Sequence, residues 1–255
     1  MSEKLRALLF DVDGTLADTE RDGHRVAFNR AFAEAGLDWN WSVELYGELL
    51  AVTGGKERIR HFLERYHSGF EAPPDLAGFV AGLHAAKTRH YVRMLTEGGI
   101  PLRSGVERLL KAASTAGLRL AIATTTTPDN VTALLASTLG EEGAALFECI
   151  GAGDVVPAKK PAPDIYLYVL EKMGLDPAEC VAFEDSENGL RSALGAKLKT
   201  IVTTNDYTRG HDFGGAALVV DRLGEPGEPF ELIDGDPAGA EYVDLDLVRR
   251  VHGHQ

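Results

Sequence analysis

The sequence predicts an α/β fold in which a doubly wound parallel sheet carries a small helical domain inserted after its first strand. Two observations lead to this prediction. From about residue 100 onward, short apolar segments of β type alternate with helical segments, the pattern of a parallel sheet with right-handed crossovers. Between residues 19 and 98, apolar residues recur at helical spacing, and this stretch has helical rather than strand character.

The first strand is expected at Leu5–Phe10, an apolar run of the kind that a central parallel strand shows. The helical segment after it has a stop signal at Gly36, and its last, long helix follows the Pro73-Pro74 break and ends near Gly98-Gly99. The apolar positions that mark its helices are Val26, Phe28, Ala31, Phe32, Val43, Tyr46, Leu49, Ile59, Phe62, Phe79, Leu83 and Tyr91.

The second half of the chain should complete the sheet. Helices are expected at 106–116, 131–139, 164–173 and 189–196, and strands at 118–123, 149–152, 180–183, 199–202 and 218–220. Residues 224–239 are rich in glycine, proline and acids, as loops are, and 242–251 can form one short amphipathic helix. We therefore expect an α/β core at 1–18 and 99–223, a helical cap at 19–98 and an acidic, Gly- and Pro-rich tail at 224–255.

The composition is that of a globular protein with an acidic surface. Of its 255 residues 44% are hydrophobic and 25% charged, and the net charge of −13 argues against binding to nucleic acid or to anionic membranes. The two cysteines, Cys149 and Cys180, fall in apolar segments and are expected to be buried reduced thiols. The first strand begins close to Met1 and no apolar run approaches membrane length, so we expect a cytoplasmic monomer, or a chloroplast stromal one whose transit peptide has been removed.

Two acidic residues, Asp11 and Asp13, directly follow the first strand, at the edge where open α/β sheets bind ligands. Residues two apart on an extended segment point the same way, and Gly14 permits a turn after them. Two carboxylates in one pocket repel each other, so the pair requires either a metal ion or a shared proton. The other interpretation is a strand that simply ends in an acidic turn.

Three later strands also end in residues that suit chemistry. A run of four threonines, Thr124–Thr127, precedes a helix and can offer hydroxyl and N–H groups to a phosphate, although threonines also cap helices. Lys160 precedes Pro161 and Pro163 in a stiff loop, which can also be an ordinary basic turn. Glu184 and Asp185 leave an apolar strand together, an arrangement that is costly unless a cation or hydrogen-bond donors meet them.

In this order, each after a predicted strand, the four motifs resemble those of the haloacid dehalogenase-like hydrolases. The resemblance implies a Rossmann-like core in which Asp11 attacks phosphorus and Asp13 protonates the leaving oxygen and later activates water. It also implies that Thr124 contacts the phosphoryl group and that Lys160 pairs with both the nucleophile and that group. Mg²⁺ would be held by Asp11, the Asp13 carbonyl and Asp185, with Glu184 reached through water.

Further segments resemble a subgroup, the CbbY-type phosphatases, which remove a phosphate from xylulose 1,5-bisphosphate. These segments are Thr19–Arg25, Thr53–Arg58 and His84–Lys87, and the likeness covers roughly residues 5–221. Between Thr19 and His24 the chain has one residue more than the simplest members. The resemblance implies that the substrate, a phosphorylated sugar, is bound by Asp11, Glu20, His24, Tyr46, Gly54, Gly55, Lys56, Arg58, His84, Lys87, Thr124, Thr125, Thr126, Asn130 and Lys160.

The cap is also expected to bind a second phosphate. Lys56, Arg58 and Lys87 bring cations to segments that should face the cleft, and Gly54-Gly55 leaves backbone N–H groups open to an anion. His84 and Lys87 lie three residues apart, on one face of a helix, so we expect them to meet the same end of the ligand. The alternative is a solvated basic face.

Three other functions fit the same residues. A sugar-phosphate mutase of the β-phosphoglucomutase type uses the same nucleophile but returns the phosphoryl group to its substrate, so released phosphate distinguishes the two. Another small-molecule phosphatase of the family is the second alternative. A non-catalytic binding protein on this fold is the third, and the intact Asp11, Asp13, Lys160 and Asp185 argue against it.

Overall fold

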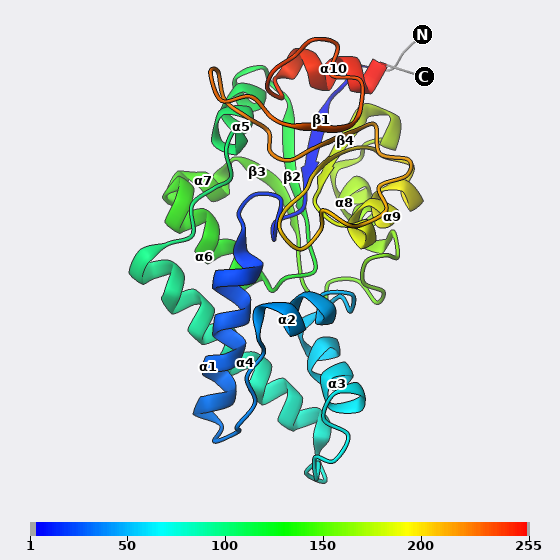
Figure 1. Ribbon diagram of the computed structural model, residues 1–255. Coiled ribbons are helices and arrows are strands. Elements are labelled where there is room, and N and C mark those ends of the chain that lie inside the picture. Colours follow the sequence, from blue (N-terminus) through cyan, green and yellow to red (C-terminus); the bar gives the residue numbers. More distant parts are fainter. Residues whose placement is uncertain (1–3, 254–255) are drawn as a thin grey trace.

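The computed structural model describes residues 4–253, with an α/β part above a helical part (Figure 1). Its sheet has the strand order β3-β2-β1-β4-β5-β6-β7, and all neighbours are parallel except β6 and β7. The strands are β1 (Ala7–Phe10), β2 (Arg119–Ala123), β3 (Phe147–Gly151), β4 (Cys180–Glu184), β5 (Lys199–Thr203), β6 (Leu218–Val220) and β7 (Leu232–Gly235). This confirms the α/β, Rossmann-like fold class.

The register of the three central strands places their ends at one level. Phe10 of β1 pairs with Ile122 of β2 and with Phe183 of β4. Because parallel strands run the same way, the residues that follow these positions emerge at the same edge of the sheet. Asp11, Thr124 and Glu184 therefore come together although they lie far apart in the sequence.

Helices cover both faces of the sheet because its strands are apolar on both sides. Leu8 and Phe10 contribute to one hydrophobic cluster with α5 (Val106–Thr115), α6 (Pro128–Leu139) and α10 (Leu245–Gly253). Ala7 and Leu9 belong to a second cluster, on the face covered by α8 (Asp164–Met173). The shorter elements of the core are α7 (Glu141–Ala145), η2 (Pro177–Glu179) and α9 (Glu187–Gly195).

The helical part has a hydrophobic cluster of its own, built on Trp39, Trp41 and the aromatic rings around them. It contains the π-helix η1 (Glu20–His24), α1 (Arg25–Glu34), α2 (Val43–Leu49), α3 (Gly55–Arg65) and the long α4 (Leu76–Gly98). Helix α4 packs against α1 and reaches α6 of the core (Figure 1). These elements agree with the helical pattern expected for 19–98, and the domain boundaries themselves remain a prediction.

The expected tail is not merely a loop. Residues Leu232–Gly235 form β7, which pairs antiparallel with β6 and extends the sheet. The expected amphipathic helix is present as α10, and Leu247, Val248 and Val251 bury its apolar face in the larger core cluster. Both Cys149 and Cys180 are free thiols, as expected, and Cys149 is only half-buried.

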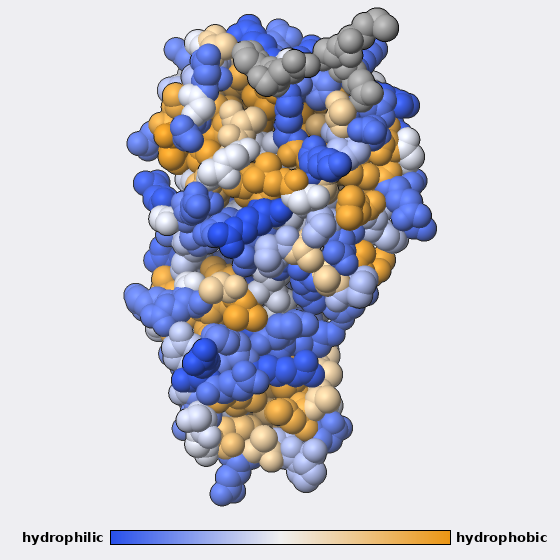
Figure 2. Space-filling view, turned by 90° about the vertical axis from the view of Figure 1, so that its right-hand side faces the viewer, coloured by the Kyte–Doolittle hydropathy of each residue, from blue (hydrophilic) through white to orange (hydrophobic). Residues whose placement is uncertain are grey.

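The surface is mixed rather than apolar. On the face shown in Figure 2, hydrophilic residues dominate and hydrophobic residues form several separate patches. Among residues 4–253 the structure contains no helix that combines the length and the apolar character needed to cross a membrane.

Candidate active site

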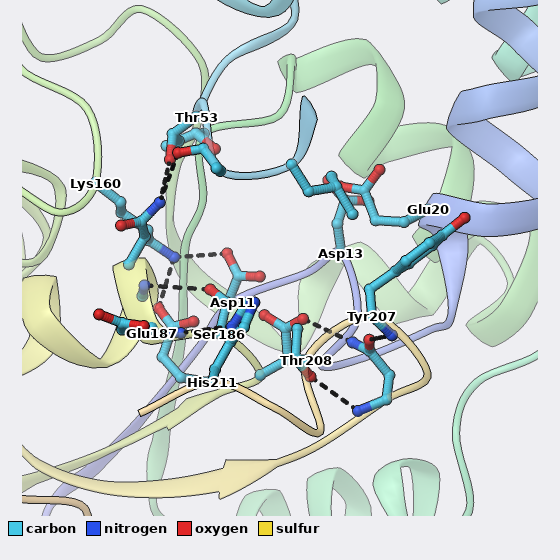
Figure 3. A pocket seen from close by; sticks show the side chains of 18 of the residues that line it. Asp11, Asp13, Glu20, Thr53, Lys160, Ser186, Glu187, Tyr207, Thr208 and His211 are labelled. Atoms are coloured by element: carbon cyan, nitrogen blue, oxygen red, sulfur yellow. Dashed lines mark hydrogen bonds and ion pairs between the residues drawn. The ribbon is translucent and has the colours of Figure 1, made fainter. Parts of the chain in front are cut away.

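The centre of the site is an ion pair at the end of β1. Lys160 Nζ lies 2.6 Å from Asp11 Oδ1 and 2.7 Å from Glu184 Oε1, and all three side chains are buried (Figure 3). The backbone N–H of Asp11 donates to the carbonyl of Phe183, which fixes the first residue after β1 against β4. Tyr166 OH also donates to Glu184 Oε1, at 2.5 Å. One cation therefore links two carboxylates that come from neighbouring strands.

Three carboxylates form a site for a divalent metal ion. Oxygen atoms of Asp11, Glu184 and Asp185 lie within 4.8 Å of one another. Burial, opposed by the Lys160 ammonium, raises the pKa of Asp11 to about 7, and burial with the neighbouring carboxylates raises the pKa of Asp185 well above its usual range. Glu184 Oε2 is buried and has no hydrogen-bond partner among the described residues. The orphaned oxygen and the excess negative charge fit a bound cation.

Two glycines leave room for this acidic cluster. A Cβ atom at Gly14, whose φ of +85° is in the left-handed region, would overlap the Asp185 carboxylate. A Cβ atom at Gly189 would likewise overlap the carboxylate of Glu184. Asn205 Nδ2 donates to Asp185 Oδ2 at 2.8 Å and so holds the third acid in place.

The side chain of Asp13 is not part of the metal cluster. Its Oδ1 accepts hydrogen bonds from Thr19 Oγ1 at 2.5 Å and from His24 Nε2 at 2.9 Å. Burial alone would raise the pKa of Asp13, but the His24 ring, the Thr19 hydroxyl and the Lys87 ammonium hold it well below its usual range. The Asp13 carboxylate therefore belongs to a separate network from that of Asp11.

The tautomer of His24 follows from its two partners. Lys87 Nζ lies 2.9 Å from His24 Nδ1, and an ammonium group can only donate, so Nδ1 is the acceptor. The ring hydrogen is then on Nε2, where it points at Asp13. Lys87 is itself buried, packs over the rings of Phe28 and Tyr91, and has a pKa lowered to about 8 by burial.

The extra residue between Thr19 and His24 is accommodated by the π-helix η1. The N–H of Arg25 donates to the carbonyl of Glu20, an i to i+5 hydrogen bond that takes up one more residue than an α-helical turn. His24 is the last residue of this turn and is buried against Tyr91, with ring centroids 4.1 Å apart. The additional residue therefore does not prevent His24 from reaching Asp13.

The threonine motif lies at the end of β2. Thr124 and Thr125 line a cavity of about 310 Å³ that also contains Asp11 and Lys160. Thr126 Oγ1 instead accepts from Asn130 Nδ2 at 2.9 Å, and neither Thr126 nor the buried Asn130 lines this cavity. The first two threonines are placed to contact a ligand, and the other two expected residues support the loop.

Three cap residues expected to bind substrate form a connected group. Glu20 and Arg58 line the same cavity as Asp11, and Tyr46 lies behind them, where it donates to Glu20 Oε2 at 2.5 Å and accepts from Arg58 Nη1 at 3.0 Å. Tyr46 and Arg58 are buried, and Arg58 also donates to the carbonyl of Leu49. Arg58 thus lines the cavity of Asp11 and not the second cavity described below.

A second cavity, of about 370 Å³, lies between the helical part and the α/β part. Gly55, Lys56 and His84 line it from the helical part, and Thr125 lines both cavities. Gly54, at the N-terminus of α3, is adjacent but does not line either cavity. Burial and the charges of Lys87, Lys56 and Lys159 lower the pKa of His84 to about 4, so this cavity has a positive field.

The structure separates His84 from Lys87, which were expected to meet one end of the ligand. His84 faces the second cavity, whereas Lys87 is bound to His24 and lines neither cavity. The two side chains lie about one turn apart on α4, but burial among Phe28 and Tyr91 directs Lys87 toward the Asp13 network. In this arrangement Lys87 does not line the second cavity, and its expected contact with a second phosphate remains a prediction.

Several residues that support the site were not among those predicted from the sequence. Tyr166, Asn205 and Thr19 hold Glu184, Asp185 and Asp13 through hydrogen bonds. Arg103 spans the two chain crossings between core and cap: its backbone N–H donates to Leu16, and its guanidinium donates to the carbonyls of Thr204 and Asp221 at 2.5 and 2.7 Å. Tyr166, Asn205 and Arg103 lie outside every motif found in the sequence, and Thr19 only begins the segment Thr19–Arg25.

Comparison with known proteins identifies the class to which this fold and site belong. The sequence model of the haloacid dehalogenase-like hydrolases matches residues 5–197, and the chain belongs to this family. Within it, the chain is 47% identical over 249 residues to the plasmid-encoded protein CbbY of Cupriavidus necator, covering 97% of each chain. It is 53% identical over 213 residues to CbbY of Rhodobacter capsulatus, covering 84% of this chain and 91% of that one.

Solved structures lead to the same group. CbbY from Rhodobacter sphaeroides in complex with phosphate has a TM-score of 0.80 and 48% identity, covering 86% of this chain and 94% of that one. A variant of that protein in complex with xylulose 1,5-bisphosphate has a TM-score of 0.81 and 47% identity, covering 88% and 96%. The chain is therefore an enzyme, a CbbY-type phosphatase of the haloacid dehalogenase-like hydrolases, which confirms the resemblance seen in its motifs.

Proposed function

We propose that this CbbY-type phosphatase removes the 1-phosphate of xylulose 1,5-bisphosphate in two steps, with Mg²⁺ as the metal ion. The observation that carries the proposal is the pairing of Asp11 with Lys160 beside a buried acidic cluster, in a cavity lined by residues of both the α/β part and the helical part. The sugar is proposed from the relative that is described in complex with xylulose 1,5-bisphosphate.

In the first step the Asp11 carboxylate attacks phosphorus and forms an aspartyl-phosphate, which divides a slow displacement into two easier ones. Lys160, already 2.6 Å from Asp11 Oδ1, holds the nucleophile and offsets negative charge on the transferring group. Thr124 and Thr125 can donate their hydroxyl groups to phosphoryl oxygens. In the second step water attacks the aspartyl-phosphate and frees Asp11.

Proton transfer is assigned to Asp13. Its carboxyl group is held by Thr19 and His24, and it lines the cavity of Asp11 from the opposite side to Lys160 (Figure 3). The Lys87–His24 pair presents an N–H to Asp13 and so orients its carboxyl group. We assign to this group the protonation of the leaving oxygen and, in the second step, the activation of water.

Asp11, Asp185 and the Asp13 carbonyl would hold Mg²⁺, with the free Glu184 oxygen reached through water, because this ion prefers oxygen ligands and retains some of its waters. When bound, it would neutralise charge between the carboxylates and the phosphoryl oxygens. The acidic cluster supports the presence of a divalent cation, and its identity as Mg²⁺ is part of the proposal.

The two cavities suit a substrate with a phosphate at each end. They meet at Thr125, so a ligand whose reacting phosphate lies at Asp11 can extend past Thr125 toward Lys56 and His84. Glu20 and Arg58 line the first cavity and can bind sugar hydroxyls between the two phosphates. We also propose that residues 19–98 act as a cap domain on the core formed by 1–18 and 99–223, and that the protein works as a monomer.

The function is tested by incubating the purified enzyme with xylulose 1,5-bisphosphate and Mg²⁺ and measuring inorganic phosphate and the remaining sugar phosphate. We expect one equivalent of phosphate and xylulose 5-phosphate. A panel of other sugar phosphates, including glucose 1-phosphate, serves as the comparison. Transfer of the phosphoryl group to another position without release would indicate a mutase and contradict the proposal.

A further inference from the structure

Two lysines from different parts of the molecule share one carboxylate beside the second cavity. Asp154, in the loop after β3, accepts from Lys56 Nζ at 2.5 Å and from Lys159 Nζ at 2.7 Å, one hydrogen bond on each oxygen. Lys56 belongs to α3 of the cap, whereas Lys159 belongs to the core loop that leads to Lys160. The three residues therefore form a bridge between cap and core.

Lys56 and Lys159 both line the second cavity, and Asp154 is the carboxylate that their ammonium groups share. All three residues of the bridge line the second cavity, and the aliphatic stem of Lys159 lies against Gly54, next to the first turn of α3. Among residues 4–253, neither lysine forms a hydrogen bond to any other side chain than Asp154. The hydrogen bonds from Lys159 and Lys56 lower the pKa of Asp154 to about 2, so the carboxylate is charged at neutral pH.

The Asp154 side chain can be displaced from the two lysines. It is 60% exposed, whereas the side chain of Lys159 is only 16% exposed. An exposed ion pair contributes little free energy, so the carboxylate can turn toward water at small cost. A phosphate group carries more charge than a carboxylate and has three acceptor oxygens, so it competes well for two adjacent ammonium groups.

We infer that Lys159 determines specificity for bisphosphates: it supplies, from the core, a second cation for the phosphate that Lys56 meets from the cap, and Asp154 is the internal anion that this phosphate displaces. The inference rests on the proposed function, which it deepens. When the distal phosphate occupies the second cavity, it takes the place of Asp154 between Lys56 and Lys159. The bisphosphate then holds cap and core together.

Binding measurements in an Asp11→Asn background test the inference separately from turnover. Calorimetry with Mg²⁺ present compares xylulose 1,5-bisphosphate with xylulose 1-phosphate, which lacks the distal group. We expect Lys159→Met to weaken binding of the bisphosphate about ten-fold, since a charge-assisted contact is lost, and to leave the monophosphate unaffected. Lys159→Arg, which keeps the charge, should restore most of the loss.

Asp154→Asn gives the opposite sign. Removing the competing anion should tighten binding of the bisphosphate about two- to five-fold and leave the monophosphate unchanged. Lys111→Met, at an exposed lysine of α5, controls for the loss of one positive charge and should change neither ligand.

The outcomes separate the two proposals. Absence of phosphate release by the unsubstituted enzyme contradicts the proposed function alone. A ratio of bisphosphate to monophosphate affinity that Lys159→Met does not change overturns the inference, whether or not the enzyme releases phosphate. Weaker bisphosphate binding in Asp154→Asn would likewise overturn it, because Asp154 would then be a support for the two lysines and not a competitor.

Discussion

Lys87 and His24 are joined by a hydrogen bond of 2.9 Å between Nζ and Nδ1, inside the protein and away from both cavities. Because Nδ1 accepts this bond, the ring hydrogen is on Nε2, 2.9 Å from Asp13 Oδ1. A lysine on the long α4 of the cap thus fixes the protonation geometry of an acid that follows β1 of the core. The relationship makes Lys87 a positioning residue for Asp13.

We expect Lys87→Met to lower kcat about ten-fold with little change in KM, since the His24 tautomer is no longer fixed and part of the general acid–base contribution of about 10²–10⁴ is lost. The loss should be equal for a bisphosphate and for a matched monophosphate. Steady-state kinetics on both substrates provide the measurement, with Lys111→Met as control. A loss confined to the bisphosphate would instead assign Lys87 to the distal phosphate.

The buried Lys87 ammonium should also make stability depend on pH. Burial lowers the pKa of Lys87 from 10.5 to about 8, despite the nearby charges of Asp13 and Glu20. Between these two values the unfolded chain binds a proton that the folded chain does not, so the free energy of unfolding contributed by this group rises with pH, by about 3 kcal/mol at most. Below pH 8 both states are protonated and this contribution is constant.

Urea unfolding of the native protein and of Lys87→Met at several pH values measures this effect, because titration of the other groups cancels in the difference. We expect the difference between the two proteins to change between about pH 8 and pH 10.5, in favour of the native protein as the pH rises. A difference that stays flat across this interval would show that Lys87 is not a buried charge at neutral pH.

Turnover should depend absolutely on Asp11. Asp11→Asn cannot form an acyl phosphate, and we expect no phosphate release above background. Asp13→Asn should retain binding and lose about 10²–10⁴-fold in kcat, because the leaving oxygen has no proton donor. Single-turnover assays with purified protein measure both. Appreciable turnover by Asp11→Asn would remove Asp11 from the role of nucleophile.

Tyr166 should act on the metal site through Glu184. Its hydroxyl lies 2.5 Å from Glu184 Oε1, which also accepts from Lys160, so Tyr166→Phe removes one of the two donors that orient this carboxylate. We expect the Mg²⁺ concentration for half-maximal activity to rise about ten-fold, as for other residues that orient metal ligands. Tyr168→Phe, on the same helix and only half-buried, is the matched control; equal shifts in both variants would disprove the assignment.

The sequence was sufficient to predict the residues that stand at strand ends. Asp11, Glu184 and Asp185 stand at the ends of β1 and β4, and a parallel sheet brings such positions to one edge; Lys160, in the loop between β3 and α8, was predicted from its motif. Tyr166 and Asn205 reach the same acids from 18 and 20 positions along the chain, through the packing of α8 and of the loop after β5. No local pattern encodes those contacts.

Other parts of the arrangement could not be predicted because side-chain direction depends on packing. The spacing of His84 and Lys87 correctly places them near each other on α4, but the aromatic residues around Lys87 turn its ammonium toward His24. Strand β7 was not predicted because its four residues, Leu232–Gly235, are all exposed and lie between glycines, prolines and acids. It is ordered by pairing with β6, not by an apolar face of its own.

The π-turn at Glu20–His24 lets the chain take up one residue more without rotating the helix that follows it. Each residue advances a helix by about 100°, so one residue more or less in an ordinary helix would rotate everything beyond it. Here the wide turn absorbs the additional residue: Glu20 stays at the cavity and Phe28 and Phe32 stay in the cluster of the cap. We expect deletion of Asp22 to convert the π-turn to an α-helical turn and so to change the angle between Glu20 and His24. Insertion or loss of one residue in this turn can therefore change the orientation of Glu20 relative to His24, the partner of Asp13, without repacking the helices of the cap.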